Sequence, residues 1–289
     1  METKKIILKR GGTLCFAQSG DDLGKPVFFF HGTPGSRLFH PPDEVTKKHG
    51  IRLISIDRPG YGESTFQPGR RILDWSSDIV ELAEHLGIQN FHVTGHSGGG
   101  PYVLACSYAN SNRVISASII SSVGPGEAIT TETQVSTVNR LGFKYGRYLP
   151  WIIWKVLILL IYRQRSQDPW SDIDRQAPNR PNADADLIKL PEIRNNCWQS
   201  EVEAFKPGLR GLAWDARLIT RPWGVQLEEI KVPVSIWHGS EDNQAPPAMA
   251  HYLASKIPAC SERILQGEAH LLIFKYWEDI LIDLLRVKK

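Results

Sequence analysis

A serine flanked by glycines, Ser97 in the stretch "FHVTGHSGGGPYVLA" (residues 91–105), constrains the fold more than any other feature of the chain. The apolar run predicts a β-strand, the glycines predict a sharp turn, and the residues after 98 predict a helix. Small residues two positions either side of the serine let strand and helix approach closely while the serine takes a strained backbone conformation. A G-x-S-x-G pattern at such a turn predicts a nucleophile at the carboxyl end of a sheet.

A phosphate-binding loop is the competing interpretation of these glycines. Such a loop needs Lys-Ser or Lys-Thr after its last glycine, whereas Pro101 and Tyr102 follow Gly100, and the G-x-G-x-x-G spacing is also missing. The phosphate interpretation is therefore rejected. The first helical amides, beginning at Gly98, are instead expected to point at the serine and to stabilise a developing oxyanion.

Short apolar runs alternate with helical patterns along the rest of the chain, which predicts a mostly parallel sheet with crossover helices. Strands are predicted at 26–30, 51–56, 91–95, 114–123, 232–239 and near 261–265, with a hairpin formed by 6–9 and 13–17 around Gly11 and Gly12. Helices are predicted at 98–110, 247–257, 271–286 and 74–87, the last with Asp74 as N-cap and Gly87 as stop.

The interval 124–230 breaks this alternation and contains six of the nine tryptophans. It predicts an inserted, mainly helical cap (a lid) with a long surface loop, "QDPWSDIDRQAPNRPNADAD" (167–186), on a core domain made of 1–123 and 231–289. The apolar run 149–162 is interrupted by Lys155 and is shorter than the roughly 20 residues of a spanning helix. We therefore expect no membrane span, and a helix there that packs on the body of the protein.

A serine nucleophile needs a base, an acid that orients the base, and a second oxyanion donor. His270 in "QGEAH" follows the last predicted strand and is the candidate base. Asp242 in "WHGSEDNQAPP" follows the strand at 232–239 and is the candidate acid, with the adjacent Glu241 as the alternative. The amide of Thr33 in "HGTPG" (31–35) is the candidate second donor.

These motifs, together with "DRPGYGES" (57–64) and "RPWGVQLEEIKVPVSIWHGSED" (221–242), resemble those of the α/β-hydrolase-fold serine hydrolases over nearly the whole chain. The chain order Ser, Asp, His is the one this fold uses. The resemblance implies an α/β fold with an eight-stranded, mostly parallel sheet flanked by helices, a cap after the sixth strand, and a catalytic triad of Ser97, Asp242 and His270. Ala269 departs from the family, which often has glycine there, and this puts the conformation of that loop in question.

Other polar residues near these motifs are assigned structural roles. His31 and His96 are expected to donate hydrogen bonds beside the site. His92 and His96 lie four apart on a strand and turn, where their side chains do not converge on one metal. Asp57 and Arg58 are expected to form an ion pair or to anchor a turn. No metal site and no cofactor is predicted.

The charge balance and the cysteine content limit which partners and which cellular compartment are expected. The chain has 34 Lys and Arg against 31 Asp and Glu, and because this net charge is small, a nucleic-acid partner is not predicted. The four cysteines are widely separated and are expected to be free thiols in a reducing compartment. The basic N-terminus lacks the apolar core of a signal peptide, so a cytoplasmic protein is expected. The oligomeric state has no signal in the sequence.

The predicted function is hydrolysis of a carboxylic ester of a hydrophobic small molecule through an acyl-enzyme, because an apolar cap would make a partly dry pocket over the serine. A proline iminopeptidase-like aminopeptidase is the first alternative, since that group also carries an HG-x-PG loop; Glu192, Glu201 and Glu203 are available to bind a substrate ammonium group. A ligand-binding or signalling homologue with little turnover is the second.

Overall fold

The computed structural model describes residues 2–129, 137–163 and 180–286. Its eight strands form one sheet in the order β1-β2-β4-β3-β5-β6-β7-β8. β1 and β2 form an antiparallel hairpin, β2 is antiparallel to β4, and every pair from β4 to β8 is parallel, which confirms the predicted sheet. The strands are β1 Thr3–Ile7, β2 Thr13–Gly20, β3 Lys25–Phe30, β4 Ile51–Ile56, β5 Phe91–His96, β6 Val114–Ile120, β7 Val234–Gly239 and β8 Cys260–Leu265.

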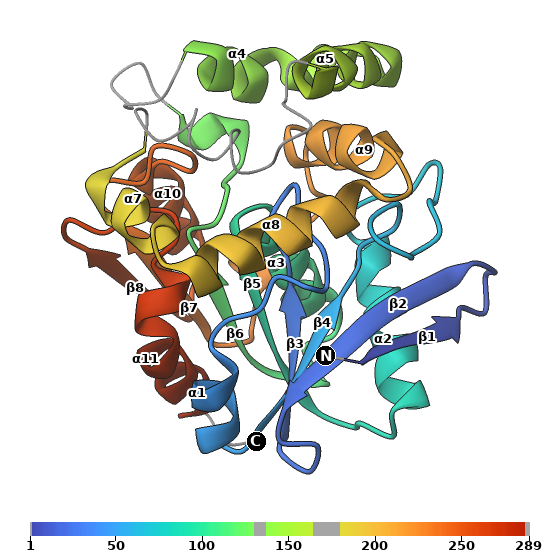
Figure 1. Ribbon diagram of the computed structural model, residues 1–289, viewed down its shortest axis with the longest axis vertical. Coiled ribbons are helices and arrows are strands. Elements are labelled where there is room, and N and C mark those ends of the chain that lie inside the picture. Colours follow the sequence, from blue (N-terminus) through green and yellow to red (C-terminus); the bar gives the residue numbers. More distant parts are fainter. Residues whose placement is uncertain (1, 130–136, 164–179, 287–289) are drawn as a thin grey trace.

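The central strands read as continuous apolar runs because both faces of the sheet are covered. Along β3, Phe28 and Phe30 belong to the core on one face, and Val27 and Phe29 to the core on the other. Helices α2 (Asp74–His85), α3 (Gly100–Ala109) and α10 (Pro247–Lys256) contribute to the first core, whereas α11 (Ile273–Leu285) contributes to the second (Figure 1).

Several boundaries differ from the sequence prediction, two of them for identifiable local reasons, and one short helix was not predicted. Asp74 is the first residue of α2, whose N-cap is Leu73, because its carboxylate accepts the backbone N–H of Arg71 instead of capping the helix. β6 ends at Ile120 rather than at 123, since Ser121 takes a φ of 45° that leaves the extended conformation. Helix α1 (Asp43–Lys48) was not predicted and has only six residues.

The segment between β6 and β7 (residues 121–233) is mainly helical where the structure describes it. Figure 1 shows its helices over the edge at which the parallel strands end, with α4 and α5 farthest from the sheet. The predicted surface loop lies mostly outside the described residues. The helices are α4 Thr137–Tyr145, α5 Trp151–Arg163, α7 Asn182–Ile188, α8 Pro191–Phe205 and α9 Arg210–Ile219.

The apolar run of the sequence analysis forms α5, which packs on α9 through one side only. Ile158 is buried there, and the ring of Trp151 lies 5.9 Å from that of Trp214 in α9. The opposite side of α5 is exposed, so the expected packing on the body of the protein holds for one side of the helix only. Within the described part of the chain, no helix combines the length and apolar character needed to cross a membrane.

Candidate active site

Ser97 lies at the turn between β5 and α3, where its backbone φ of 53° falls in a region that non-glycine residues rarely adopt. The glycines two positions away make this turn possible. A Cβ on Gly95 would lie 2.8 Å from Val103 Cγ2, and one on Gly99 would overlap the carbonyl oxygen of Phe30. Strand, turn and helix therefore pack too closely for any side chain at these two positions, and the strain is concentrated on the serine.

His270 and Asp242 are brought together from two different loops at the same end of the sheet. Asp242 lies between β7 and α10, and His270 lies between β8 and α11. The Nδ1–H of His270 donates to Asp242 Oδ2 at 2.8 Å, and both side chains are buried. The other carboxylate oxygen of Asp242 accepts the backbone N–H groups of Gln244 and Ala245, each at 2.9 Å. Glu241 is exposed, so Asp242 is the acid that faces the imidazole.

This pairing sets the charge of both groups. Burial alone would lower the pKa of His270, but the Asp242 carboxylate outweighs burial and raises that pKa above its usual 6.5. Burial would raise the pKa of Asp242, and the facing His270 imidazole turns the shift downward. The pair therefore stabilises an imidazolium over a carboxylate, which is the charge state that follows proton uptake by the histidine.

The backbone around His270 is held by two further residues. Asp184, in α7, accepts the N–H of His270 at 3.2 Å and the N–H of Leu271 at 2.7 Å. His96, the neighbour of Ser97, donates Nε2–H to the carbonyl of His270 at 2.9 Å, and its ring lies 4.7 Å from the His270 ring. Burial and the nearby His270 lower the pKa of His96 to about 3, so it is a neutral donor, as the sequence analysis expected.

The loop that carries Thr33 runs beside the serine turn. A Cβ on Gly32 would lie 3.3 Å from Ser97 Cβ, and a Cβ on Gly98 would overlap Thr33 Oγ1. Thr33 and Gly98 are thus next to each other, and both lie close to Ser97. Their two amides are the candidates for binding one oxyanion.

Arg58 fixes the conformation of the loop that carries Thr33. Its guanidinium donates to the carbonyl of His31, to the carbonyl of Gly32 at 2.9 Å, and to Thr33 Oγ1 at 2.7 Å, while its Nε donates to Asp215 of α9 at 2.8 Å. Of the two expected roles for Asp57 and Arg58, the turn anchor agrees with the structure and the mutual ion pair does not, because Arg58 pairs with Asp215 and Asp57 pairs with Arg37.

Asp57 is the anchor of its own turn. It binds Arg37 at 2.6 Å and accepts the N–H of Glu63 at 3.2 Å. Burial raises the pKa of Asp57 to about 6, against the lowering effect of Arg37. For Asp215, burial also acts upward, but Arg70 and Arg58 outweigh it and lower the pKa to about 2. Both carboxylates therefore serve to hold loops, as the sequence analysis expected of Asp57.

A cleft of about 260 Å³ lies between the start of the β6–β7 segment, α4 and the end of α9. Thr220 is part of its wall, and the preceding Ile219 lies 3.2 Å from the Cβ position on Gly98. Ile219 also belongs to an apolar cluster with Val123 and Met249, against which Phe143 packs. The cleft combines an apolar wall with the charged side chains of Glu127, Lys144, Arg147 and Arg221.

Among the hydrogen bonds of the described residues, none joins Ser97 Oγ to His270. Such a bond commonly forms only when substrate is bound. The structure thus joins Asp242 to His270, and Thr33 to Gly98 beside Ser97, with His96 linking the two groups.

Asp184, Asp215 and Arg58 have roles at this site that the sequence analysis did not assign. Asp184 lies in a Pro- and Asp-rich stretch without periodicity, and Asp215 is one polar position on a helix. The only signal in the sequence is a polar residue on the core-facing side of an amphipathic helix, where its side chain becomes buried.

A family model described as the alpha/beta hydrolase fold matches residues 25–275. The chain is 24% identical over 261 residues to a proline iminopeptidase of Lactobacillus helveticus, which covers 85% of this chain and 83% of that protein. It is 26% identical over 247 residues to the bifunctional esterase/perhydrolase DCH of Acinetobacter calcoaceticus, with 83% of each chain covered.

Two further similarities cover very different shares of the chain. The chain is 37% identical over 141 residues to the dihydrolipoyllysine-residue acetyltransferase component of the acetoin cleaving system of Pseudomonas putida, a match that spans 37% of that protein and 46% of this chain. A solved structure of a hydrolase from Pseudomonas aeruginosa PA01 superposes with a TM-score of 0.71 at 15% identity over 99% of both chains, which shows the same fold.

Proposed function

The chain belongs to the α/β-hydrolase fold family, and we propose that it is a serine hydrolase that cleaves the carboxylic ester of a hydrophobic small molecule. The observation that carries this proposal is the buried hydrogen bond between His270 Nδ1 and Asp242 Oδ2, at the same sheet end as the strained turn of Ser97. In this proposal the β6–β7 segment is the cap predicted at 124–230.

The proposed reaction proceeds through an acyl-enzyme. Ser97 Oγ attacks the ester carbonyl while His270 Nε2 takes its proton, and the amides of Thr33 and Gly98 bind the oxyanion. Collapse of the tetrahedral intermediate expels the alcohol, which receives the proton from His270. Water then attacks the acyl group with His270 as base, so that the acid is released and Ser97 regains its proton. Asp242 stabilises the imidazolium in both halves.

One feature favours a hydrophobic acyl group, and a second favours an ester. The apolar cluster around Ile219 borders Gly98, so an acyl chain that leaves the oxyanion site meets hydrocarbon. The sequence similarity to an esterase/perhydrolase of A. calcoaceticus covers most of both chains.

The aminopeptidase alternative has the support of the similarity to a proline iminopeptidase. Such an enzyme must bind a substrate ammonium group with a free carboxylate. Glu203, one of the three candidates, forms ion pairs with Arg37 at 2.8 Å and with Lys206 at 3.7 Å, and Glu192 is exposed at the start of α8. The carboxylate of Glu203 is thus already paired with two cations and is not available to an ammonium group. We therefore keep the ester as the proposed substrate.

The test combines active-site labelling with a substrate panel. The purified chain and its Ser97→Ala and His270→Ala variants are treated with a fluorophosphonate, and the labelled residue is mapped by mass spectrometry. We expect labelling at Ser97 only, a loss of at least about a thousandfold in kcat/KM in both variants, and faster turnover of octanoyl than of acetyl esters. Equal turnover of the two esters contradicts the hydrophobic substrate, and cleavage of prolyl arylamides in preference to esters supports the aminopeptidase. A folded protein without labelling or turnover supports the binding homologue.

A further inference from the structure

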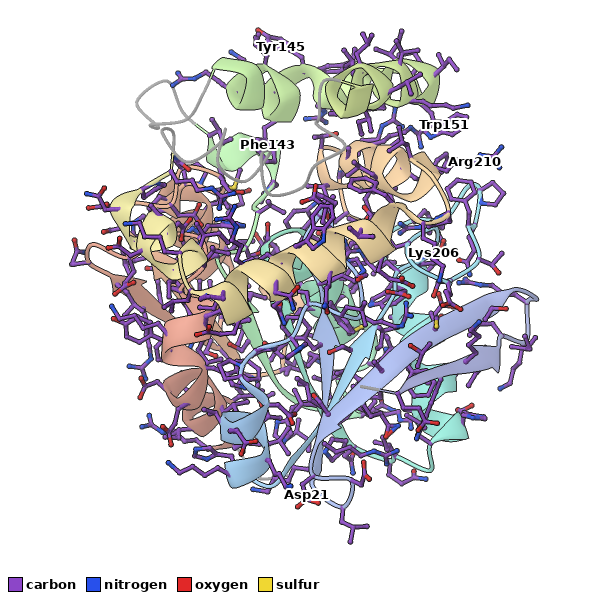
Figure 2. The ribbon with its side chains drawn as sticks, in the orientation of Figure 1. Asp21, Phe143, Tyr145, Trp151, Lys206 and Arg210 are labelled. Carbon is purple, nitrogen blue, oxygen red and sulfur yellow. The ribbon has the colours of Figure 1, made fainter. Side chains whose placement is uncertain are left out.

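Large apolar side chains are concentrated on the outer side of α4 and α5, which we call the α4–α5 face. Among the described residues, eight of the thirteen large hydrophobic side chains that are exposed belong to it. Figure 2 shows Tyr145 on the outer side of α4, with Phe143 on the side toward the sheet. The α4–α5 face consists of Leu141, Tyr145, Tyr148, Ile152, Ile153, Val156, Leu157 and Leu160, which are between 40% and 72% exposed.

The exposed positions of α5 form one continuous apolar surface. Ile152, Val156 and Leu160 follow each other at intervals of four, and Ile153 and Leu157 lie alongside them, so that neighbouring turns present adjoining side chains. From 151 to 160, every exposed residue is apolar. The opposite side is covered, since Ile158 is 7% exposed. A patch of this extent on a soluble protein indicates a contact surface.

The surroundings of this face are positively charged. Residues 137–163 contain five Lys and Arg and no Asp or Glu. Lys155 lies 5.6 Å from the centre of the Trp151 ring, and Lys144 lies 5.5 Å from that of Tyr145, so these two ammonium groups contact aromatic rings. Arg147 is paired with Glu127 at 3.2 Å. Lys155 lies with Trp151 on the α9 side of α5, and Lys144 also lines the cleft, so both lysines flank the aliphatic centre. Lysines and aromatic rings at the flanks of an aliphatic surface match the boundary between lipid headgroups and acyl chains.

The charge distinguishes between the two occupants that an apolar face can have. A second copy of this chain, related by a twofold axis, would bring the same lysines against each other. A bilayer that contains anionic lipids instead offers acyl chains to the aliphatic residues and negative headgroups to the lysines. We propose that the α4–α5 face docks the protein on the surface of a membrane that contains anionic lipids, with both helices lying parallel to that surface.

Docking in this orientation has a consequence for the substrate that rests on the proposed function. Phe143, on the inner side of α4, lines a cleft whose wall includes Thr220, and the preceding Ile219 lies next to Gly98. A hydrophobic ester dissolved in the bilayer would then enter the cleft close to the surface on which the protein lies.

Sedimentation with lipid vesicles tests the docking surface with the full chain. We expect binding to vesicles of equal parts phosphatidylcholine and phosphatidylglycerol, weaker binding at high salt, and little binding to phosphatidylcholine alone. The variant Ile152→Glu/Val156→Glu should bind at least about tenfold more weakly, because two apolar anchors become charges that the anionic surface repels. Lys144→Gln/Lys155→Gln should weaken binding and reduce its salt dependence.

Matched controls separate this face from general surface hydrophobicity and from catalysis. Ile7→Glu/Leu23→Glu changes two apolar residues that are 72% and 97% exposed elsewhere, and it should bind as the unchanged chain does. Ser97→Ala should also bind unchanged, so that docking and hydrolysis can fail separately. Ile152→Glu/Val156→Glu should keep its circular dichroism spectrum and its turnover of a water-soluble acetyl ester.

Three results would overturn the proposal. One is the absence of vesicle binding by the unchanged chain, and another is equal binding to neutral and anionic vesicles. The third is a stable dimer in sedimentation velocity that Ile152→Glu/Val156→Glu dissociates, which would make a second copy the occupant. If that variant does not fold, the Lys144→Gln/Lys155→Gln variant and the salt dependence of the unchanged chain decide between these outcomes.

Discussion

Three buried histidines lie around the carboxylate of Asp242, and their environments assign them different charges. Asp242 raises the pKa of His270, whereas burial lowers the pKa of His96 to about 3 and also lowers that of His238. His96 and His238 are therefore neutral donors, to the carbonyls of His270 and Ala245 respectively. Among the three, only His270 has a raised pKa, so it is the one suited to take up a proton as a general base.

The pH dependence of turnover tests this assignment. His270 must be neutral to act as base, so kcat/KM should fall as pH decreases through its pKa, which lies above 6.5. Asp242→Asn removes the carboxylate that raises this pKa. Its profile should shift to lower pH, and its plateau should fall by about a thousandfold to ten-thousandfold. Glu241→Gln, at the exposed neighbour, is the control that should change neither. An unshifted midpoint in Asp242→Asn would remove Asp242 from the triad.

Gly98 is the residue at which a single methyl group tests the oxyanion site. A Cβ there would overlap Thr33 Oγ1, which Arg58 holds at 2.7 Å, so the Thr33 loop must move away from Ser97. We expect Gly98→Ala to lower kcat about a hundredfold, with a smaller effect on KM. Gly142→Ala, whose Cβ meets no atom within 4 Å, should leave turnover unchanged. Normal kcat in Gly98→Ala would show that these two residues do not form the oxyanion site.

At the scale of elements, helices α7, α8 and α9 each contribute a buried polar side chain to a loop at the end of the sheet. Asp184 of α7 holds the His270 loop, Asp215 of α9 holds Arg58 behind Thr33, and Ser200 of α8 accepts the N–H of Ser36 at 3.0 Å. These three helices are thereby fixed to the sheet by directional bonds. The outer helix α5 instead packs on α9 through apolar side chains.

Asp184 provides the test of this coupling between helix and loop. Both of its oxygens accept backbone N–H groups, so Asp184→Asn must set its own NH₂ against one of those donors. Leaving a buried donor unpaired costs about 1–3 kcal/mol of the free energy of unfolding, and the displaced His270 loop should lower kcat. Asp186→Asn, two residues along α7 and 73% exposed, is the matched control. Urea unfolding and kcat measured on both variants check the prediction, and equal effects would contradict it.

The sequence predicted the elements whose signal is local. The buried strands appear as apolar runs, and Ser97 was found because the glycines that permit its strained turn are its near neighbours. Asp184 and Asp215 act on residues 86 and 157 positions away, and no spacing rule connects positions so distant in sequence. The apolar run of α5 predicted a helix, but its composition does not say which side is covered. That depends on where α9 packs.

At the scale of the whole molecule, buried ionisable groups make folding depend on pH. Burial lowers the pKa of His31, His92, His96 and His238, to about 4 for His92 and about 3 for His96. The unfolded chain takes up these protons near pH 6.5 while the folded chain does not, so stability falls as pH decreases below 6.5. Burial raises the pKa of Asp57 and Asp78 to about 6, which opposes this loss between about pH 6 and pH 4.

Burial also raises the pKa of Asp184. Four histidines still outweigh these three carboxyl groups, so the free energy of unfolding should decrease between pH 6 and pH 4. Each group contributes at most about 1.4 kcal/mol per pH unit. His92→Gln removes one of the four while the amide can still donate to Ser116 Oγ, which the ring contacts at 2.7 Å. The stability of this variant should therefore fall less steeply than that of the unchanged chain, by about 1.4 kcal/mol per pH unit. Urea unfolding followed by circular dichroism at several pH values measures both slopes, with His251→Gln, 59% exposed on α10, as control. Parallel slopes for His92→Gln and the unchanged chain would show that His92 is protonated in the folded protein, and the acid sensitivity would then have to arise from the other buried groups.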